Sequence, residues 1–203
     1  MDVHTVRNNV RFDKQIQFII EIDRLKRVVR QSLLMDRTRK ENSAEHSWHL
    51  AVMAIVLGEY ANENNIDYQR VLQMLLVHDL VEIDAGDTYC YDKEKCQTQT
   101  ERETEAAERI FNLLPSNQAR MFHDLWNEFE AQTSAESRFA DALDRLQPVL
   151  HNYTTRGKIW QVNGIKSSQV LEKMEPIKTA SPFLWKYAVQ LIEDAVTKGF
   201  LSK

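Results

Sequence analysis

The chain has 203 residues, a formal net charge of −4, and only 5 glycines and 4 prolines. This length suits one domain with a sizeable core, and the scarcity of glycine and proline favours an all-α protein. The mild negative charge gives no electrostatic reason to expect nucleic-acid binding, and no apolar run reaches the roughly 18 residues that would predict a membrane-spanning helix.

Residues 13–34 are predicted to form one helix, because apolar residues recur there at roughly helical spacing. These residues are Ile16, Ile19, Ile20, Leu25, Val28, Val29 and Leu33. Basic residues cluster in the C-terminal half, where the helix dipole favours them: Arg24, Lys26, Arg27 and Arg30. Each of these is either part of a solvated basic face or a contact for an anion. A polar connector is predicted over residues 36–42.

Ser43 is predicted to cap a second helix, which runs to about Glu63. Its inward stripe follows steps of four and three residues: His46, Leu50, Met53, Leu57 and Tyr60. His46 opens this stripe and is either a satisfied core histidine or a metal ligand. His49, three residues on, has the same two interpretations. We favour His46 as the ligand, because it is in register with the most apolar line.

A third helix, capped by Asp67, ends in a strongly apolar run over residues 71–77, which His78 and Asp79 follow directly. Buried charge usually persists only when it is paired or bound to a metal. Glu82 lies about 40° round the helix from His78 and about 60° from Asp79, so all three side chains can point into one small volume. Gly86 then breaks the helix, and Asp87 and Thr88 follow on a loop.

A polar loop is predicted over residues 88–98, and its acidic spacing does not match an EF-hand. Its two cysteines, Cys90 and Cys96, look like free thiols of a cytoplasmic protein rather than a disulfide framework. A role in lining a metal site is the less favoured interpretation. Two further helices are predicted over residues 100–114 and 116–132, the second of them after Pro115.

Ser134 is predicted to cap the next helix, whose apolar face is bordered by Asp141. Arg138 and Arg145 lie three residues before and four residues after Asp141, so this carboxylate either forms an intrahelical ion pair or turns to a functional site. We favour the site, because Asp144 is better placed for surface pairing. The remaining chain is predicted to hold a short helix near 168–174 and a last helix over 183–198.

The helical positions gather four candidate metal ligands: His46, His78, Asp79 and Asp141. Two neutral imidazoles and two carboxylates balance one divalent cation, and mixed nitrogen and oxygen donors suit Mn, Fe, Co, Ni or Zn better than Ca. A metal ion held by four protein ligands keeps room for water and a substrate oxygen. It would lower the pKa of that water and polarise a phosphoryl group, and Glu82 could take or give the proton.

These residues, in this order and on helices, resemble the metal signature of the HD-domain phosphohydrolases. The chain resembles most the branch that holds the bacterial 5′-deoxynucleotidases and their eukaryotic relatives. The similar stretches are residues 41–47, His78-Asp79 with Glu82 and Gly86-Asp87, residues 140–143, Gly157, Trp160, Gly164-Ile165 and residues 181–185. The resemblance covers about residues 13–200. It implies a single HD domain over residues 1–203, built as a helical bundle of about seven to nine helices.

The resemblance also implies a function: a cytoplasmic, metal-dependent phosphohydrolase that acts on nucleoside 5′-monophosphates. Glu82 would position the attacking water, and Asp87, with Thr88 beside it, would contact the sugar hydroxyl. An arginine that ends the first helix would contact the phosphate; Arg30 fits best and Arg27 second. The branch usually carries a tryptophan shortly after this arginine, whereas residues 31–34 here are Gln-Ser-Leu-Leu. We therefore expect a weaker preference for deoxyribose over ribose.

Two other functions stay open. One is an HD-type phosphodiesterase or nucleotide pyrophosphohydrolase, although the chain lacks the extra histidines of a typical two-metal phosphodiesterase. The other is a non-catalytic module that holds a metal or nucleotide for regulation, against which Glu82 argues. The resemblance further implies a homodimer. The first and last helices carry more large apolar residues than one inward stripe needs: Phe12, Phe18, Ile22, Phe183 and Trp185.

Overall fold

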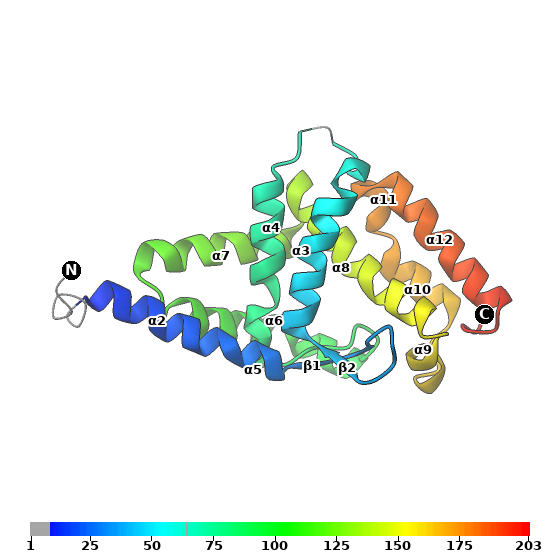
Figure 1. Cartoon of the computed structure of the whole chain (residues 1–203), viewed down its shortest axis with the longest axis horizontal. Coiled ribbons are helices and arrows are strands. Elements are labelled where there is room, and N and C mark those ends of the chain that lie inside the picture. The colour runs from blue at the N-terminus through cyan, green and yellow to red at the C-terminus, as the bar shows by residue number, and fades with distance from the viewer. Residues whose placement is uncertain (1–8, 64) are drawn as a thin grey trace.

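The computed structural model describes residues 9–63 and 65–203, and this part of the chain is helical apart from one two-stranded antiparallel sheet (Figure 1). The longer helices are α2 (Val10–Ile22), α3 (Ser43–Leu57), α4 (Tyr68–Val77), α6 (Lys93–Phe111), α7 (Ser116–Ala131), α8 (Ala135–Thr154), α10 (Ser167–Met174) and α12 (Pro182–Thr197). The short elements are η1 (Asp23–Arg27), β1 (Val29–Leu33), β2 (Lys40–Asn42), η2 (Gly58–Tyr60), η3 (His78–Val81), α5 (Glu82–Ala85), α9 (Lys158–Val162) and α11 (Ile177–Ala180). The prediction of an all-α bundle is confirmed.

Helices α3, α4 and α8 form the centre of the molecule (Figure 1). Helix α4 packs on α3, α7 and α8, while α8 also contacts α10, α11 and α12. Helix α8 is therefore buried over most of its length, and Phe139, Ala142 and Leu143 are inaccessible to solvent. This packing fixes how α8 is rotated against α3 and α4.

The prediction of one helix over residues 13–34 is wrong beyond Ile22. The chain makes one 3-10 segment, η1, and becomes extended at Val28, where φ is −78° and ψ is 112°. It then forms β1, which pairs antiparallel with β2, so the predicted polar connector contains a strand. The apolar spacing of Val28, Val29 and Leu33 fits a helix, but β-branched residues also favour strands. A local pattern does not show that a pairing partner lies further along the chain.

Helix α3 is capped by Asn42 and not, as predicted, by Ser43. The Asn42 side chain accepts a hydrogen bond from the Glu45 backbone N–H, and the Glu45 carboxylate accepts one from the Asn42 backbone N–H. This is a capping box shifted by one residue from the predicted cap. It leaves the buried Ser43 hydroxyl free to donate to Glu82 Oε2 at 2.5 Å.

The other predicted helix starts are largely confirmed. Asp67, Ser134 and Ser181 cap α4, α8 and α12 with their side chains. Helix α6 begins seven residues earlier than the predicted residue 100, because Asp92 caps a polar first turn that has no apolar stripe. None of the helices within residues 9–63 and 65–203 is long and apolar enough to cross a membrane.

Two glycines with positive φ give a matched test of the packing at the C-terminal end. Gly157 (φ +69°) and Gly164 (φ +61°) both adopt the left-handed conformation. A Cβ on Gly157 would lie 1.9 Å from the backbone oxygen of Phe200, whereas a Cβ on Gly164 would meet nothing within 4 Å. We expect Gly164→Ala to lower the free energy of unfolding by about 1 kcal/mol through backbone strain alone. Gly157→Ala should cost about 3 kcal/mol or more.

Urea denaturation of both variants measures this difference. Equal losses would show that the chain end around Phe200 moves aside without cost.

Candidate active site

Four side chains converge where α3, α4 and α8 pack together. His46 lies in the first turn of α3, and His78 and Asp79 open η3 directly after α4. Asp144 lies in the middle of α8. His46 Nε2 is 2.7 Å from Asp144 Oδ1 and 3.9 Å from Asp79 Oδ2, and His78 Nε2 is 3.0 Å from Asp79 Oδ1 and 3.9 Å from Asp144 Oδ1. Three of the four predicted ligands, all except Asp141, are thus brought together.

The orientation of His78 fits a bound cation. Its Nδ1 lies 3.0 Å from the backbone oxygen of Leu75, to which it donates, so Nε2 carries a lone pair. This Nε2 is buried, makes no hydrogen bond within the described residues, and faces the Asp79 carboxylate. Two electron-rich atoms at this distance repel each other unless a positive charge lies beside them.

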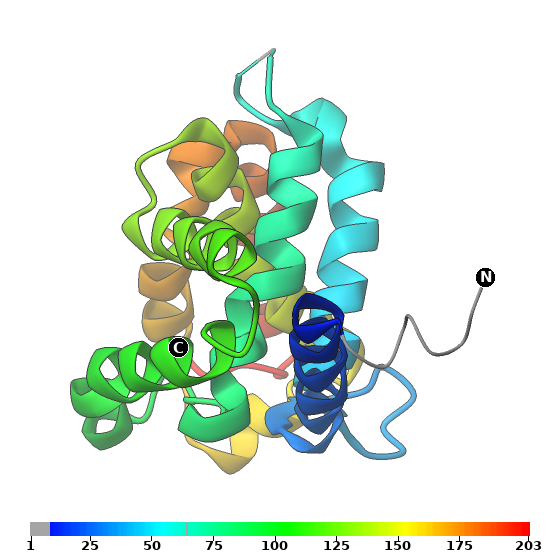
Figure 2. The ribbon, with the colours of Figure 1, turned by 90° about the vertical axis from the view of Figure 1, so that its left-hand side faces the viewer.

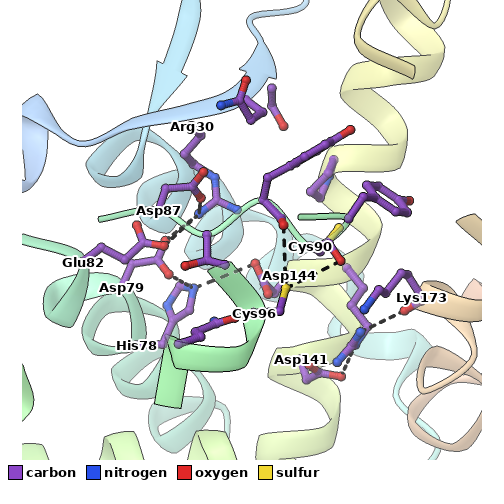
Figure 3. A pocket seen from close by; sticks show the side chains of 18 of the residues that line it. Arg30, His78, Asp79, Glu82, Asp87, Cys90, Cys96, Asp141, Asp144 and Lys173 are labelled. Carbon is purple, nitrogen blue, oxygen red and sulfur yellow. Dashed lines mark hydrogen bonds and ion pairs between the residues drawn. The ribbon is translucent and has the colours of Figure 1, made fainter. Parts of the chain in front are cut away.

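Asp141 does not join this group, so its predicted place is taken by Asp144. The Asp141 carboxylate accepts a hydrogen bond from Arg145 Nε at 2.6 Å, and Arg145 also donates to the backbone oxygen of Lys173. Figure 3 shows Asp141 turned away from His78, whereas Asp144 points toward it. The two aspartates are only about 60° apart round the helix. The packing of α8 on α4 decides which of them faces the histidines, and the sequence does not contain that rotation.

The electrostatics of the group also fit a divalent metal ion. Burial raises the pKa of Asp79 and of Glu82, and the Asp79 charge raises that of Glu82 further. Burial lowers the pKa of His46 to about 3, so its imidazole is neutral and can act as a ligand. Burial would raise the pKa of Asp144, but its hydrogen bond with His46 holds it below the usual range. Two imidazoles and two carboxylates are donors that Mn, Fe, Co, Ni and Zn accept.

Glu82 lies beside this group, as the helical spacing predicts. It opens α5, is buried, and accepts a hydrogen bond from the Ser43 hydroxyl. Its Oε1 is 3.8 Å from Arg30 Nη1. The sequence did not reveal the contact with Ser43, because that residue was expected to cap α3.

Arg30 projects from β1 into the same volume, although it was expected at the end of a helix (Figure 3). Its Nη1 lies 3.0 Å from Asp79 Oδ2 and 3.4 Å from Asp87 Oδ1. Burial would lower the pKa of its guanidinium, but the neighbouring carboxylates, Asp79 first, raise it above the usual range. Arg27, the second choice for this contact, lies in η1 and is exposed. Of the two arginines predicted for this contact, Arg30 is therefore the one that reaches the site.

A cavity of about 340 Å³ opens beside these residues. Its aromatic lining comes from Tyr89, Tyr91, Phe129 and Trp160, and Asp87 and Thr88 also line it. The Thr88 hydroxyl accepts a hydrogen bond from Arg102 at 2.8 Å. Cavities of this size take small organic ligands.

The cavity lining also shows where residues 31–34 and the two cysteines lie. Gln31 and Ser32 line the wall that follows Arg30, so this wall has no aromatic side chain from residues 31–34. Cys90 and Cys96 line the cavity as free thiols. They are not members of either metal-ligand cluster found within the described residues.

A second cluster, formed by Glu41, His49, His151 and Gln147, lies behind the first one and was not predicted as a unit. Ligand atoms of Glu41, His49 and His151 lie within 4.8 Å of one another. His49 therefore turns to this cluster and not to His78. A buried glutamine and a histidine four residues apart on α8 were the available signal, since this spacing places both on one helix face.

The chain is similar in sequence to one protein family and to proteins of known name. A family model described as "HD domain" matches residues 22–185. The 5′-deoxynucleotidase HDDC2 of Homo sapiens is 32% identical over 136 residues, which are 66% of this chain and 65% of the human protein. The chain thus matches slightly less than two thirds of the length of this curated relative.

Solved structures give a consistent result. The crystal structure of a predicted metal-dependent phosphohydrolase from Magnetospirillum magnetotacticum MS-1 superposes with a TM-score of 0.91 at 48% identity, covering 95% of this chain and 96% of that one. An HD-domain phosphohydrolase from Listeria innocua superposes with a TM-score of 0.68 at 16% identity, covering 91% of this chain and 90% of that one. The second similarity is one of fold alone.

The finding that Asp144, and not Asp141, lies beside the two histidines can be tested directly. We expect Asp144→Asn to weaken Mn²⁺ binding by more than about 100-fold, because loss of a ligand should exceed the 10- to 100-fold effect of a residue that only orients one. Asp141→Asn should keep the affinity of the unaltered chain, because that carboxylate pairs with Arg145. Isothermal titration calorimetry on chelator-treated protein measures both constants, and Asp79→Ala serves as the positive control. Loss of binding in Asp141→Asn alone would restore the sequence-based assignment.

Proposed function

This chain belongs to the HD domain family, as the sequence resemblance implied, and on that premise we propose that it is a metal-dependent phosphomonoesterase acting on nucleoside 5′-monophosphates. One observation carries the proposal: the four-residue group of His46, His78, Asp79 and Asp144 adjoins an arginine and a buried glutamate at one cavity. The names of two similar proteins, a 5′-deoxynucleotidase and a predicted metal-dependent phosphohydrolase, support the reaction type.

The residues proposed to hold the metal are His46, His78, Asp79 and Asp144, and the metal is one of Mn, Fe, Co, Ni or Zn. A metal ion bound there lowers the pKa of a water ligand and polarises a phosphoryl oxygen. The unpaired lone pair of His78 Nε2 supports this assignment. The chain's own contribution is to bring two imidazoles and two carboxylates close together, with His46, His78 and Asp79 buried.

Arg30 is proposed to bind the substrate phosphate. Its guanidinium already lies among carboxylates of the site, 3.0 Å from Asp79 and 3.4 Å from Asp87. A phosphate group placed beside the metal ligands would offer it oxygens that match a guanidinium fork. The arginine then neutralises charge on the phosphoryl group during transfer to water.

Glu82 is proposed to take the proton of the attacking water or to protonate the leaving oxygen. Burial and the Asp79 charge raise its pKa, which brings it nearer to the range where a carboxyl group both takes and gives a proton. The Ser43 hydroxyl, at 2.5 Å from Oε2, fixes one oxygen, so the other, Oε1, faces the side of Arg30.

Asp87 and Thr88 are proposed to contact the sugar. Both line the cavity, and the Asp87 carboxylate can accept a hydrogen bond from the 3′-hydroxyl that both deoxynucleotides and ribonucleotides carry. Next to Arg30, the cavity is lined by Gln31 and Ser32 instead of a tryptophan. These are polar side chains that do not penalise a 2′-hydroxyl by apolar contact.

We also propose that residues 1–203 form a single HD domain in a reducing, cytoplasmic compartment. A continuous apolar core that runs from α2 to α12 through the described residues supports the first statement. The free thiols of Cys90 and Cys96 support the second.

We further propose that the protein is a homodimer. Of the residues expected at the interface, Phe12 and Phe183 are exposed, whereas Phe18 is buried and Ile22 and Trp185 pack against the core. Helix α3 lies beside α4 (Figure 2) and exposes Trp48, Val52, Ile55 and Val56, whose spacing places them on one face of the helix. Helix α2 exposes Ile16, Ile19 and Ile20. We call these exposed apolar residues of the two helices the α2–α3 face, and grouped exposed apolar side chains support a binding partner.

The oligomeric state is tested by light scattering. At micromolar concentration the unaltered protein should have twice the mass of the 23.8 kDa chain. Ile55→Glu should be monomeric, because it places a charge in the α2–α3 face. The control is Val162→Glu, which changes an equally exposed residue on α9, away from that face. A monomeric unaltered protein would contradict the proposal.

Replacing Glu82 tests its part in proton transfer. Glu82→Gln keeps the shape and the acceptor for Ser43 but removes the ionisable group. We expect Mn²⁺ affinity to stay close to that of the unaltered chain and kcat to fall by about 10²- to 10⁴-fold, the usual range for a general acid or base. Asp84→Asn is the matched control, because Asp84 lies on the same short helix but pairs with Arg109 outside the cavity. An unchanged kcat in Glu82→Gln would make Glu82 a structural residue.

Phosphate release from a substrate panel tests the function itself. We expect release from dAMP, AMP, dCMP and CMP, with a deoxy-to-ribo ratio of kcat/KM below about 10, because nothing near Arg30 leaves a 2′-hydroxyl unpaired in an apolar pocket. Nucleoside 3′-phosphates and 3′-deoxy analogues should react poorly, because they lack the donor for Asp87. Activity confined to deoxynucleotides would assign the exclusion of ribose to another residue. No release from any monophosphate would favour the pyrophosphohydrolase or regulatory alternative.

A further inference from the structure

Three buried polar atoms next to the proposed metal site face one another without a hydrogen bond. They are Arg30 Nε, Glu41 Oε2 and His46 Nδ1, which have no hydrogen-bond partner within residues 9–63 and 65–203. Glu41 Oε2 lies 3.7 Å from His46 Nδ1 and 4.0 Å from Arg30 Nε. Glu41 is 1% exposed and His46 is inaccessible, so bulk water does not satisfy these atoms. Buried unpaired polar atoms are costly and call for an explanation.

The position of the proton on the His46 ring explains why His46 Nδ1 and Glu41 Oε2 form no hydrogen bond. His46 Nε2 lies 2.7 Å from Asp144 Oδ1, and in this hydrogen bond a neutral ring carries its proton on Nε2 and a lone pair on Nδ1. That lone pair faces Glu41 Oε2, which is also an acceptor, so the two cannot bond. If Nε2 gives its lone pair to a metal ion, the neutral ring must carry the proton on Nδ1. Nδ1–H then points at Glu41, so the metal-binding form of His46 gains an acceptor there.

The same carboxylate oxygen, Glu41 Oε2, also faces the Nε group of Arg30. Arg30 Nε is always a donor, and Glu41 Oε2 is the carboxylate oxygen within 4.0 Å of it. A hydrogen bond from Nε would leave the Nη groups of Arg30 to face Asp79 and Asp87, where the phosphate is proposed to bind. Glu41 thus connects one proposed metal ligand to the proposed phosphate-binding arginine.

The second carboxylate oxygen of Glu41, Oε1, accepts a hydrogen bond from α8. Gln147 Nε2 donates to Glu41 Oε1 at 2.7 Å and lies 3.0 Å from His151 Nε2. His151 Nδ1 lies 2.7 Å from the backbone oxygen of Leu33, to which it donates, so its Nε2 is the acceptor for Gln147. Leu33 belongs to β1, the strand that carries Arg30. Glu41 is therefore fixed between α8 and the sheet.

A metal ion bound by Glu41, His49 and His151 is the competing explanation of this cluster. Against it stands the position of the Gln147 amide nitrogen, which is 2.7 Å from Glu41 Oε1, 3.0 Å from His151 Nε2 and 3.4 Å from His49 Nδ1. The space that the three candidate ligand atoms share is thus filled by an NH₂ group, whose two hydrogens go to the two nearest acceptors, Glu41 Oε1 and His151 Nε2. The cluster is a hydrogen-bond support and not a second metal site.

We infer that Glu41 is a positioning residue, which accepts a hydrogen bond from His46 Nδ1–H in the metal-binding form of the ring and orients Arg30 through its Nε. The inference rests on the proposed metal site. Carboxylates that orient a metal-ligating histidine in this way fix its tautomer and raise metal affinity. Gln147 and His151 hold the Glu41 carboxylate in place for this role.

Mn²⁺ titration of chelator-treated Glu41→Gln tests the inference. A glutamine keeps the shape and can still accept from Gln147, but its NH₂ group then faces His46 and favours the wrong tautomer. We expect the dissociation constant for Mn²⁺ to rise about 10- to 100-fold. The thermal midpoint of the chelator-treated variant should stay close to that of the unaltered chain, because Oε2 makes no hydrogen bond there. A purely structural role would instead lower this midpoint and leave the dissociation constant unchanged, which would overturn the inference.

Three further variants serve as controls for the Mn²⁺ titration of Glu41→Gln. Glu45→Gln makes the same charge change four residues away and preserves the capping box, so it should bind Mn²⁺ like the unaltered chain. If Glu41→Gln does not fold, Glu41→Asp carries the test, because it keeps the charge but withdraws the carboxylate by one methylene group and should also weaken Mn²⁺ binding. His49→Gln should hold as many Mn²⁺ ions as the unaltered chain; loss of one ion would make Glu41 a metal ligand and overturn the inference.

Failure of the proposed function would look different. Normal phosphate release with equal Mn²⁺ affinity in Glu41→Gln and the unaltered chain would overturn the role of Glu41 alone. Mn²⁺ binding that depends on Glu41, but no release from any monophosphate, would overturn the proposed function alone. An unaltered chain that binds no Mn²⁺ would overturn both.

Discussion

Desolvation of carboxylates is the constraint on which the site depends. Asp79 and Glu82 are buried, and Asp87 and Asp144 lie within the same small volume. Water would solvate such charges far better than protein does, so they persist together only beside positive charge. The guanidinium of Arg30 supplies part of it, and a divalent ion between the histidines and aspartates would supply the rest. The same excess of negative charge that makes the site costly also attracts cations to it.

The helices that surround the site orient its functional side chains. Helix α3 starts at Asn42, and this choice of cap frees the next residue, Ser43, to hold Glu82. Helix α4 ends where η3 begins, so His78 can donate back to the helix through Nδ1 and keep Nε2 for the site. In both cases a helix end, where backbone groups lack partners, sets the orientation of a functional side chain. Three of the four proposed metal ligands therefore lie at the ends of α3 and α4, whereas Asp144 comes from the middle of α8.

The small sheet gives the site its third support. Strand β1 carries Arg30, and the middle of β2 carries Glu41, so pairing of the two strands brings the phosphate-binding candidate beside the carboxylate that faces His46. Gln147 on α8 fixes that carboxylate from the opposite side. A change in strand register would alter the position of Arg30 and the environment of His46 together. The proposed metal ligand His46 and the proposed phosphate-binding Arg30 thereby share one buried neighbour, Glu41.

The sequence by itself determined the helical class, most helix starts, the convergence of His78, Asp79 and Glu82, and the inward direction of His46 through the apolar stripe that it opens. These features are local: caps, apolar spacing and neighbouring residues on one helix are set within a few turns of chain. Tertiary structure alone decided three others: the extension of residues 29–33 into a strand, the use of Ser43 to hold Glu82, and the choice of Asp144 over Asp141. Each of these depends on a partner far away in the chain or on the rotation of one packed helix against another. Local periodicity places two aspartates about 60° apart on α8, and only the packing of that helix decides which one meets the histidines.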